Sequence, residues 1–166
     1  AATEAAISAA PTVVRLSSDN GRLVQNPMET RGYVGSWDAI EELYTLHAAA
    51  GKPQTVGRDL AHFIFGLPED RVRAVVKDVG GGFGAKNPLY PEQALVLWTA
   101  KKLGRPVRWQ ASRSETFLAD YQGRGQAADA EMAFDADGKV LAFRVRVLAD
   151  LGAFLGPRGS TAPNMW

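Results

Sequence analysis

The feature that most constrains this chain is a run of four glycines within five residues, G-G-G-F-G from Gly80 to Gly84. Glycine weakens helices and strands alike, because it loses more conformational freedom on folding than any other residue. Such a run is therefore expected where the backbone turns tightly or approaches a ligand closely. Consecutive N–H groups in a loop of this kind can form a concave site for a phosphate or an oxo group. A purely structural turn is an equally good interpretation of the pattern.

The spacing of these glycines separates the loop from two familiar phosphate-binding motifs. The dinucleotide fingerprint is G-x-G-x-x-G at the start of a helix, whereas this loop reads G-x-G-x-G and the next predicted helix begins seven residues after Gly84. The P-loop needs Gly-Lys followed by Ser or Thr, but Ala85-Lys86-Asn87 stands here. Neither of these nucleotide-binding classes is indicated.

Regular elements are predicted on both sides of the loop. Alternating residues indicate a strand at 71–77, and a helix is predicted at 91–103, between Pro91 and Gly104. Apolar residues cover most of the circumference of this helix, which is typical of a buried helix. We therefore expect Leu95 and Trp98 to lie in the core.

Other segments complete the prediction of the fold. A short helix is predicted at 3–10, and an amphipathic helix at 54–65 places Val56, Leu60, Phe63 and Ile64 on one face. Strands are predicted at 12–16, 33–37, 43–47 and 107–110, and a hairpin is predicted from 126–134 and 140–148. Mixed strands with two main helices indicate an α+β fold built on a mixed β-sheet.

Composition excludes several classes of protein. The 166 residues include no Cys and two His, which excludes iron–sulfur ligation, thiolate zinc and a histidine-rich metal cluster in this chain. A net charge of +1 is not the basic footprint of a nucleic-acid-binding protein. The chain has no apolar run of about 18 residues and its start lacks the basic region of a signal peptide. We expect a cytoplasmic protein without a membrane span.

Short motifs follow one another along the chain and resemble a known family. They read N-P-M-E-T-R-G at 26–32, G-L-P-E-D-R-V-R at 66–73, V-G-G-G-F-G-A-K at 79–86, L-Y-P-E at 89–92, L-G-R-P-V-R-W at 103–109, R-S-E at 113–115, D-G-K at 137–139 and D-L-G-A-F at 150–154. Each motif alone is weak. Together and in this order they resemble the large subunits of the molybdenum hydroxylases, which include xanthine dehydrogenase, aldehyde oxidase and aerobic carbon monoxide dehydrogenase.

The resemblance implies a domain and a cofactor. Residues 12–166 would be the N-terminal part of the first molybdopterin-binding domain, preceded by a linker helix at 1–11, in a chain that looks truncated at both ends. The cofactor would be a molybdopterin-type molybdenum cofactor, often found in its cytosine dinucleotide form.

The resemblance also implies roles for single residues of the glycine loop. Gly81 and Gly82 would let the chain approach the cofactor, while the backbone of Phe83 and Gly84 would lie near the oxo group of the metal. We expect the Lys86 side chain to matter less, because these contacts are made by backbone.

Three further residues are interpreted through the same resemblance. Asn87 stands where the xanthine-oxidising branch places a substrate-orienting glutamate, so Asn87 is a candidate substrate residue and a purine substrate is disfavoured. Gln25 lies in a region where relatives often carry His or Gln, and it is a further candidate site residue. Glu29 is interpreted as structural, as a partly buried carboxylate bound to backbone N–H groups.

The implied activity is that of an oxidoreductase that hydroxylates an aldehyde, a heterocycle or a similar carbon centre with oxygen derived from water. Iron–sulfur and FAD centres would lie on partner subunits, and the remainder of the large subunit would complete the site. The catalytic glutamate, and any copper-binding cysteine loop, would follow Trp166, so no catalytic residue is assigned and this segment alone is expected to be inactive. Two alternatives remain: an inactive scaffold, and a non-molybdenum phosphate-binding module.

Overall fold

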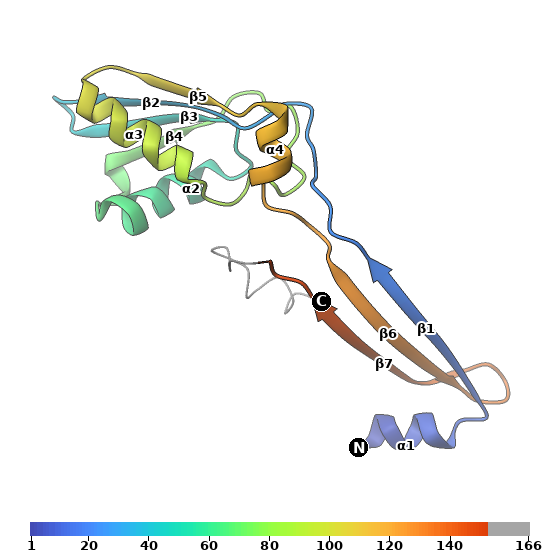
Figure 1. Cartoon of the computed structure of the whole chain (residues 1–166). Coiled ribbons are helices and arrows are strands. Elements are labelled where there is room, and N and C mark those ends of the chain that lie inside the picture. Colours follow the sequence, from blue (N-terminus) through green and yellow to red (C-terminus); the bar gives the residue numbers. More distant parts are fainter. Residues whose placement is uncertain (153–166) are drawn as a thin grey trace. The chain divides into compact units, whose positions relative to one another are not determined.

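The computed structural model describes residues 1–152, which form two compact units (Figure 1). Among these residues, the first unit comprises 1–23 and 123–152, and the second comprises 24–122. One of the two sheets contains both parallel and antiparallel strand pairs, so the predicted α+β class with a mixed sheet is confirmed. Ala153 and Phe154, which end the last sequence motif, lie outside the described residues.

The first unit is a three-stranded antiparallel sheet with a helix against it. Its elements are α1 (Ala2–Ala9), β1 (Thr12–Asn20), β6 (Gln126–Phe134) and β7 (Val140–Ala149), and the strand order is β1-β6-β7. The predicted hairpin is thus confirmed, and β1 continues four residues beyond the predicted strand. Gly138 takes a positive φ of 81° in the hairpin turn, where a left-handed residue is required.

The two faces of this sheet differ because side chains alternate along a strand. On one face Leu16 and Val145 align through the register of β1, β6 and β7, and both are exposed among the described residues. On the other face Glu131 pairs with Arg15 and Arg144. The helix α1 also pairs with Arg144 through its acidic residue, Glu4, and contacts β6 and β7.

The second unit is a four-stranded mixed sheet with helices packed on it. Its strands are β2 (Gly32–Asp38), β3 (Leu43–Ala48), β4 (Val72–Val75) and β5 (Val107–Gln110), in the order β4-β3-β2-β5. Its helices are α2 (Pro53–Asp59), the π-helix η1 (Leu60–Phe65), the 3-10 turn η2 (Glu69–Arg71), α3 (Pro91–Leu103) and α4 (Arg113–Ala119). The core is formed by buried residues of these elements, among them Tyr33, Tyr44, Leu46, Leu60 and Leu97.

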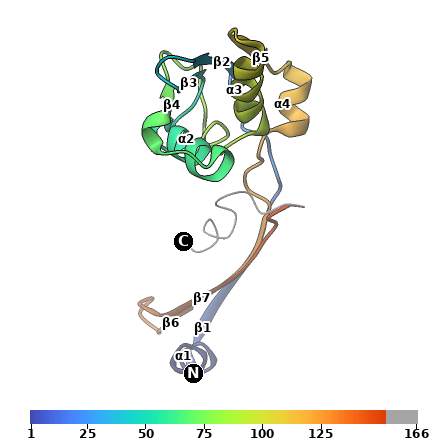
Figure 2. The same cartoon turned by 90° about the vertical axis from the view of Figure 1, so that its left-hand side faces the viewer.

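The helix α3 lies alongside β2 and β5 (Figure 2). At Gly35 of β2 the backbones of strand and helix approach closely. A Cβ atom on Gly35 would lie 2.6 Å from the carbonyl carbon of Val96 and 2.8 Å from the backbone nitrogen of Leu97. These are backbone atoms of a regular helix, so they cannot turn aside as a flexible side chain can.

We therefore expect Gly35→Ala to lower the free energy of unfolding by about 3 kcal/mol, at the upper end of the usual cost of overpacking. Gly32→Ala in the same strand is the matched control, because its Cβ would meet its nearest neighbour at 3.8 Å, an ordinary contact distance. Urea titration of both variants measures the difference, and equal losses would contradict the assigned role of Gly35.

The bounds predicted for α3 are confirmed, but its predicted burial is wrong. Leu95 and Trp98 are 57% and 52% exposed, whereas Val96 and Leu97 are buried against the sheet. The helix is apolar on most sides, yet within residues 1–152 its buried side chains are those that face the sheet, which it contacts at β2, β3 and β5. Apolar composition alone does not fix which side of a helix is covered.

The two leucines provide a direct test of this orientation. We expect Leu97→Ala to lower the free energy of unfolding by about 2–5 kcal/mol, because it removes a fully buried side chain and leaves a cavity. Leu95→Ala should stay within about 0.5 kcal/mol, as is usual for surface substitutions. Thermal or urea unfolding of the two variants checks the order, and the reverse order would overturn it.

The other predicted helix, 54–65, is also changed by its surroundings. It begins as α2 and continues as the π-helix η1, whose wider turns shift later residues around the axis. Val56 and Leu60 are buried as predicted, but Phe63 and Ile64 are exposed. Gly66 ends the helix with φ +63°, as its place in the sequence indicates.

The helix α1 confirms the short helix predicted at 3–10 to within one residue, whereas α4 is a helix that the sequence analysis did not predict. The capping box of α4 joins Ser112 and Glu115 and is visible in the sequence as S-R-S-E. Within residues 1–152, no helix combines the length and the apolar character needed to cross a bilayer.

Candidate cofactor-binding site

The glycine loop connects β4 to α3 in the second unit, and its backbone takes conformations that few residues adopt. The φ angle is +92° at Gly81, +48° at Phe83 and +94° at Gly84. Glycine reaches such angles without strain, but for a bulky residue a left-handed conformation is an outlier that costs about 1–3 kcal/mol. Phe83 is also 75% exposed. Strained backbone and an exposed aromatic ring therefore coincide, a combination that is typical of functional positions.

The loop leaves four consecutive backbone N–H groups free. The N–H groups on either side are used within the protein, because Gly80 donates to the Glu29 carboxylate at 2.9 Å and Ala85 donates to a carbonyl of the loop at 2.8 Å. For the residues between them, Gly81 to Gly84, no hydrogen-bond acceptor is found within residues 1–152. Consecutive amides of this kind can bind anionic oxygen atoms. They belong to the four residues that the sequence assigns to the cofactor.

Three of the four glycines of the loop, Gly80, Gly81 and Gly84, are required for an identifiable reason. A Cβ atom on Gly80 would lie 2.5 Å from the Cβ of Glu29, and one on Gly81 would lie 3.0 Å from the ring of Phe83. Among residues 1–152 no atom lies within 4 Å of such a position on Gly84, so the requirement there comes from its positive φ. Within this part of the chain, the space in front of Gly84 is open.

The Glu29 carboxylate holds both ends of the loop. Its Oε2 atom accepts the Gly80 N–H and also the Lys86 Nζ, at 2.8 Å. Partial burial acts to raise the pKa of the Glu29 carboxyl, but the hydrogen bonds from Lys86 and Gly80 outweigh it and lower the pKa below its ordinary value. Glu29 is therefore ionised at neutral pH, and its predicted role as a carboxylate bound to backbone N–H is confirmed.

The Lys86 side chain has a structural partner that the sequence did not indicate. It is fully buried, and its ammonium group pairs with the Glu29 carboxylate, which is itself partly buried. A buried lysine that loses its partner carries a large cost, because an ammonium group is poorly solvated inside a protein. No local pattern reports this pair, because its members lie 57 residues apart in the sequence. The smaller effect expected for the Lys86 side chain rests on backbone contacts to the cofactor, and it stays a prediction.

A second buried ionic group stabilises the segment that carries Glu29. The Arg31 side chain is fully buried and donates to Asp120 at 2.5 Å and to Glu92 at 2.9 Å. Its guanidinium also lies 3.8 Å from the centre of the Tyr90 ring, and the Tyr90 hydroxyl donates to the carbonyl of Ala85 at 2.7 Å. Burial raises the pKa of the Tyr90 hydroxyl, so this donor stays protonated. The loop is thus connected to α3 and α4.

The structure places the remaining candidate residues in different surroundings. Asn87 is partly buried at the end of the loop, and its side-chain oxygen lies directly against the backbone of Gly51. The Gln25 side-chain oxygen is buried and has no hydrogen-bond partner among the described residues. The roles of Asn87 in substrate binding and of Gln25 in the site stay predictions.

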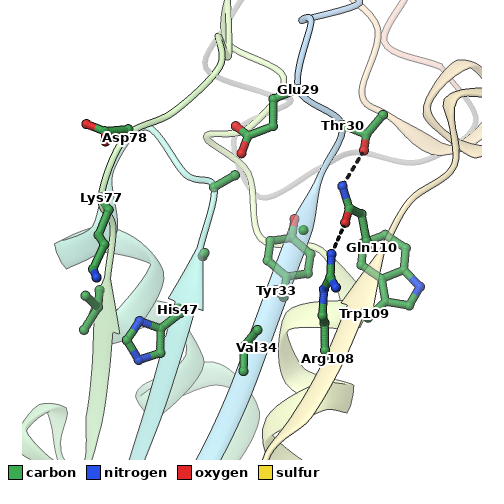
Figure 3. Close-up of a pocket in the computed structure, with 14 residues that line it drawn as sticks. Glu29, Thr30, Tyr33, Val34, His47, Lys77, Asp78, Arg108, Trp109 and Gln110 are labelled. Carbon is green, nitrogen blue, oxygen red and sulfur yellow. Dashed lines mark hydrogen bonds between the residues drawn. The ribbon is translucent and has the colours of Figure 1, made fainter.

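A shallow hollow of about 260 Å³ lies on the second unit's sheet beside Glu29 (Figure 3). His47, Lys77 and Arg108 line it from three different strands or strand ends, and Arg108 donates to the side chain of Gln110 at 2.5 Å. The hollow reaches Glu29, whose carboxylate also binds the glycine loop. His47 of β3 therefore lies on a concave surface that borders Glu29.

Comparison with known proteins identifies the family of this chain. The model of the family described as "Molybdopterin cofactor-binding domain" matches residues 2–165. The chain belongs to this family. Membership confirms the resemblance inferred from the ordered sequence motifs, and it covers both compact units.

The chain is also similar to two curated large subunits. The chain is 38% identical to the carbon monoxide dehydrogenase large chain of Hydrogenophaga pseudoflava over 93% of its own length, and 33% identical to the nicotine 6-hydroxylase large subunit of Paenarthrobacter nicotinovorans over 97%. The match covers 19% and 20% of those two proteins. This chain therefore spans about a fifth of the length of the curated relatives it matches.

A solved structure supports the same assignment. The quinoline 2-oxidoreductase of Pseudomonas putida 86 matches with a TM-score of 0.86 and 37% sequence identity, over 92% of this chain and 19% of that chain. The fold of the described residues is therefore the fold of a segment of a molybdopterin-binding domain.

Proposed function

We propose that this chain is part of the large subunit of a molybdenum-dependent hydroxylase and that its glycine loop binds the molybdopterin cofactor. The observation that carries this proposal is the row of four free N–H groups from Gly81 to Gly84 in a member of this family. A row of unpaired amides at a strained loop suits the anionic oxygens of such a cofactor better than it suits a structural turn.

The chain's own groups have a definable task in this site. When bound, the cofactor supplies the two-electron oxidation of a carbon centre with oxygen derived from water. The loop N–H groups donate hydrogen bonds to anionic oxygens and, being fixed in advance, stabilise negative charge without reorganising. The exposed ring of Phe83 provides apolar surface beside these donors, and exclusion of water strengthens their interactions.

The finer features of the function follow the family resemblance. We assign the cofactor as the cytosine dinucleotide form, the substrate as an aldehyde, a heterocycle or a similar carbon centre, and the electron acceptors as iron–sulfur and flavin centres on partner subunits. Relatives named as a large chain or a large subunit support an enzyme of several subunits. In this assignment residues 12–166 begin the first molybdopterin-binding domain, 1–11 form a linker helix, and the enzyme is cytoplasmic.

Metal and cofactor analysis of the native protein, isolated from its host, tests the proposal. We expect about one molybdenum per chain and a pterin that is released on acid oxidation. The reason is that in this class of enzyme the redox chemistry is carried by a cofactor that the protein binds. Mass spectrometry of the released nucleotide then tests the cytosine dinucleotide form. A protein that contains phosphate or a nucleotide but no molybdenum would support the phosphate-binding alternative instead.

A further inference from the structure

Two sequence motifs that lie far apart in the chain meet at one carboxylate oxygen. Glu29, from N-P-M-E-T-R-G, accepts at Oε2 both the Gly80 N–H at 2.9 Å and the Lys86 ammonium at 2.8 Å. The Glu29 N–H in turn donates to the Gly80 carbonyl at 3.0 Å. Gly80 is thus bound in both directions by one residue, and its lack of a side chain permits the approach.

The two contacts enclose the part of the loop that carries the free amides. Gly80 precedes the four free N–H groups, and Lys86 follows them after Ala85. A segment with this many glycines has many accessible backbone conformations unless other groups restrict it. Fixing both ends to the same oxygen atom restricts where the intervening N–H groups point.

The segment that holds Glu29 is itself anchored to two helices. Arg113 of α4 donates to the carbonyl of Met28 at 2.8 Å and to the side chain of Asn26. Arg31, two residues after Glu29, is bound to Glu92 of α3 and to the residue that ends α4. The Glu29 carboxylate is therefore supported by rigid elements, as an effective positioning group requires.

We propose that Glu29 is a positioning residue, which with Lys86 sets the orientation of the free N–H groups of the glycine loop toward the cofactor. This inference rests on the proposed function. It goes beyond the contacts of the loop itself, because it assigns the preorganisation of the site to a carboxylate that lies outside the glycine loop. Groups that orient direct ligands in this way are worth about 10- to 100-fold in affinity or activity.

The test compares Glu29→Gln with Asp59→Asn in the native protein. Both changes neutralise the carboxylate of a partly buried ion pair in the same unit, but Asp59 pairs with Arg58 of α2 and not with the segment that holds Glu29. Two quantities are measured in each variant: molybdenum retained after extended dialysis, and hydrogen exchange of the backbone amides of the peptide that spans Gly80 to Asn87. The melting temperature of each variant is also recorded, so that the loss of stability in the two variants can be compared.

For Glu29→Gln we expect cofactor retention to fall by about 10- to 100-fold. The hydrogen-bonded amides of the loop, those of Gly80 and Ala85, should exchange faster by a similar factor. Asp59→Asn should leave the exchange of the loop amides and the retained molybdenum unchanged. Lys86→Met, which keeps the volume and removes the charge, should reproduce the effect of Glu29→Gln on exchange.

Each outcome bears on the inference. If the wild-type protein holds molybdenum and Glu29→Gln matches Asp59→Asn in retention and exchange, the positioning role is overturned. If the wild-type protein holds no molybdenum, the proposed function fails, and exchange alone then decides the inference. Faster exchange that is specific to Glu29→Gln supports positioning of the loop, and unchanged exchange refutes it.

Discussion

Replacement of Asp120 by alanine is expected to lower the free energy of unfolding by about 3–5 kcal/mol, the usual cost of breaking a buried ion pair from one side. Asp120 and Arg31 have fully buried side chains and meet at 2.5 Å. Without Asp120 the guanidinium stays buried with Glu92 as its only carboxylate partner among the described residues. The segment 26–32 then loses its connection to the end of α4, so the effect should extend to the glycine loop.

Asp150→Ala is the matched control for this substitution. Asp150 forms an ion pair with Arg22 in which both side chains are largely exposed, and such pairs contribute little to stability. Urea titration of both variants measures the two losses of unfolding free energy. The slope of the free energy against urea concentration should be the same in both variants. A loss of under about 1 kcal/mol for Asp120→Ala would show that the Arg31 charge is satisfied without Asp120.

Gly84→Val in the native enzyme is expected to reduce turnover by about a hundredfold, the cost of a displacement of about 1 Å in a catalytic site. The φ angle of +94° at Gly84 is one that a β-branched residue does not adopt, so the loop must change its backbone. The Cβ atom would also enter the open space in front of the loop, where no atom lies within 4 Å. Molybdenum content should fall together with turnover.

Gly138→Val separates this effect from backbone strain in general. Gly138 has a φ of +81° and open space around the position of its Cβ, but it lies in the hairpin between β6 and β7. Valine there should lower the melting temperature and leave turnover and molybdenum content per folded protein unchanged. If Gly84→Val behaves like Gly138→Val, the glycine loop is a structural turn and does not bind the cofactor.

Local signals in the sequence determined much of the secondary structure. Pro91 and Gly104 bound α3 where a fixed φ and a left-handed residue are required, and the strand at 107–110 begins and ends as alternation predicts. The glycine run predicted a loop with unusual backbone angles, and Gly81 and Gly84 have them. These features depend on the conformational limits of neighbouring residues, so a sequence reports them directly.

The order of short motifs also determined the family, and with it the residues assigned to the cofactor. It did not reveal how the motifs are joined. The pairs Glu29–Lys86 and Arg31–Asp120 link residues 57 and 89 positions apart, and no local pattern reports such a contact. Lys86 looked like an ordinary charged residue after a loop until the fold buried it.

Only the tertiary structure decided which apolar side chains are covered. Leu95 and Leu97 lie on the same helix and have the same chemistry, but one faces solvent in the described structure and the other lies in the core. Phe63 and Ile64 follow the helical period in the sequence, yet the wider turns of η1 carry them away from the sheet. Periodicity states that a helix has an apolar side, whereas burial depends on the packing of elements that are distant in the chain.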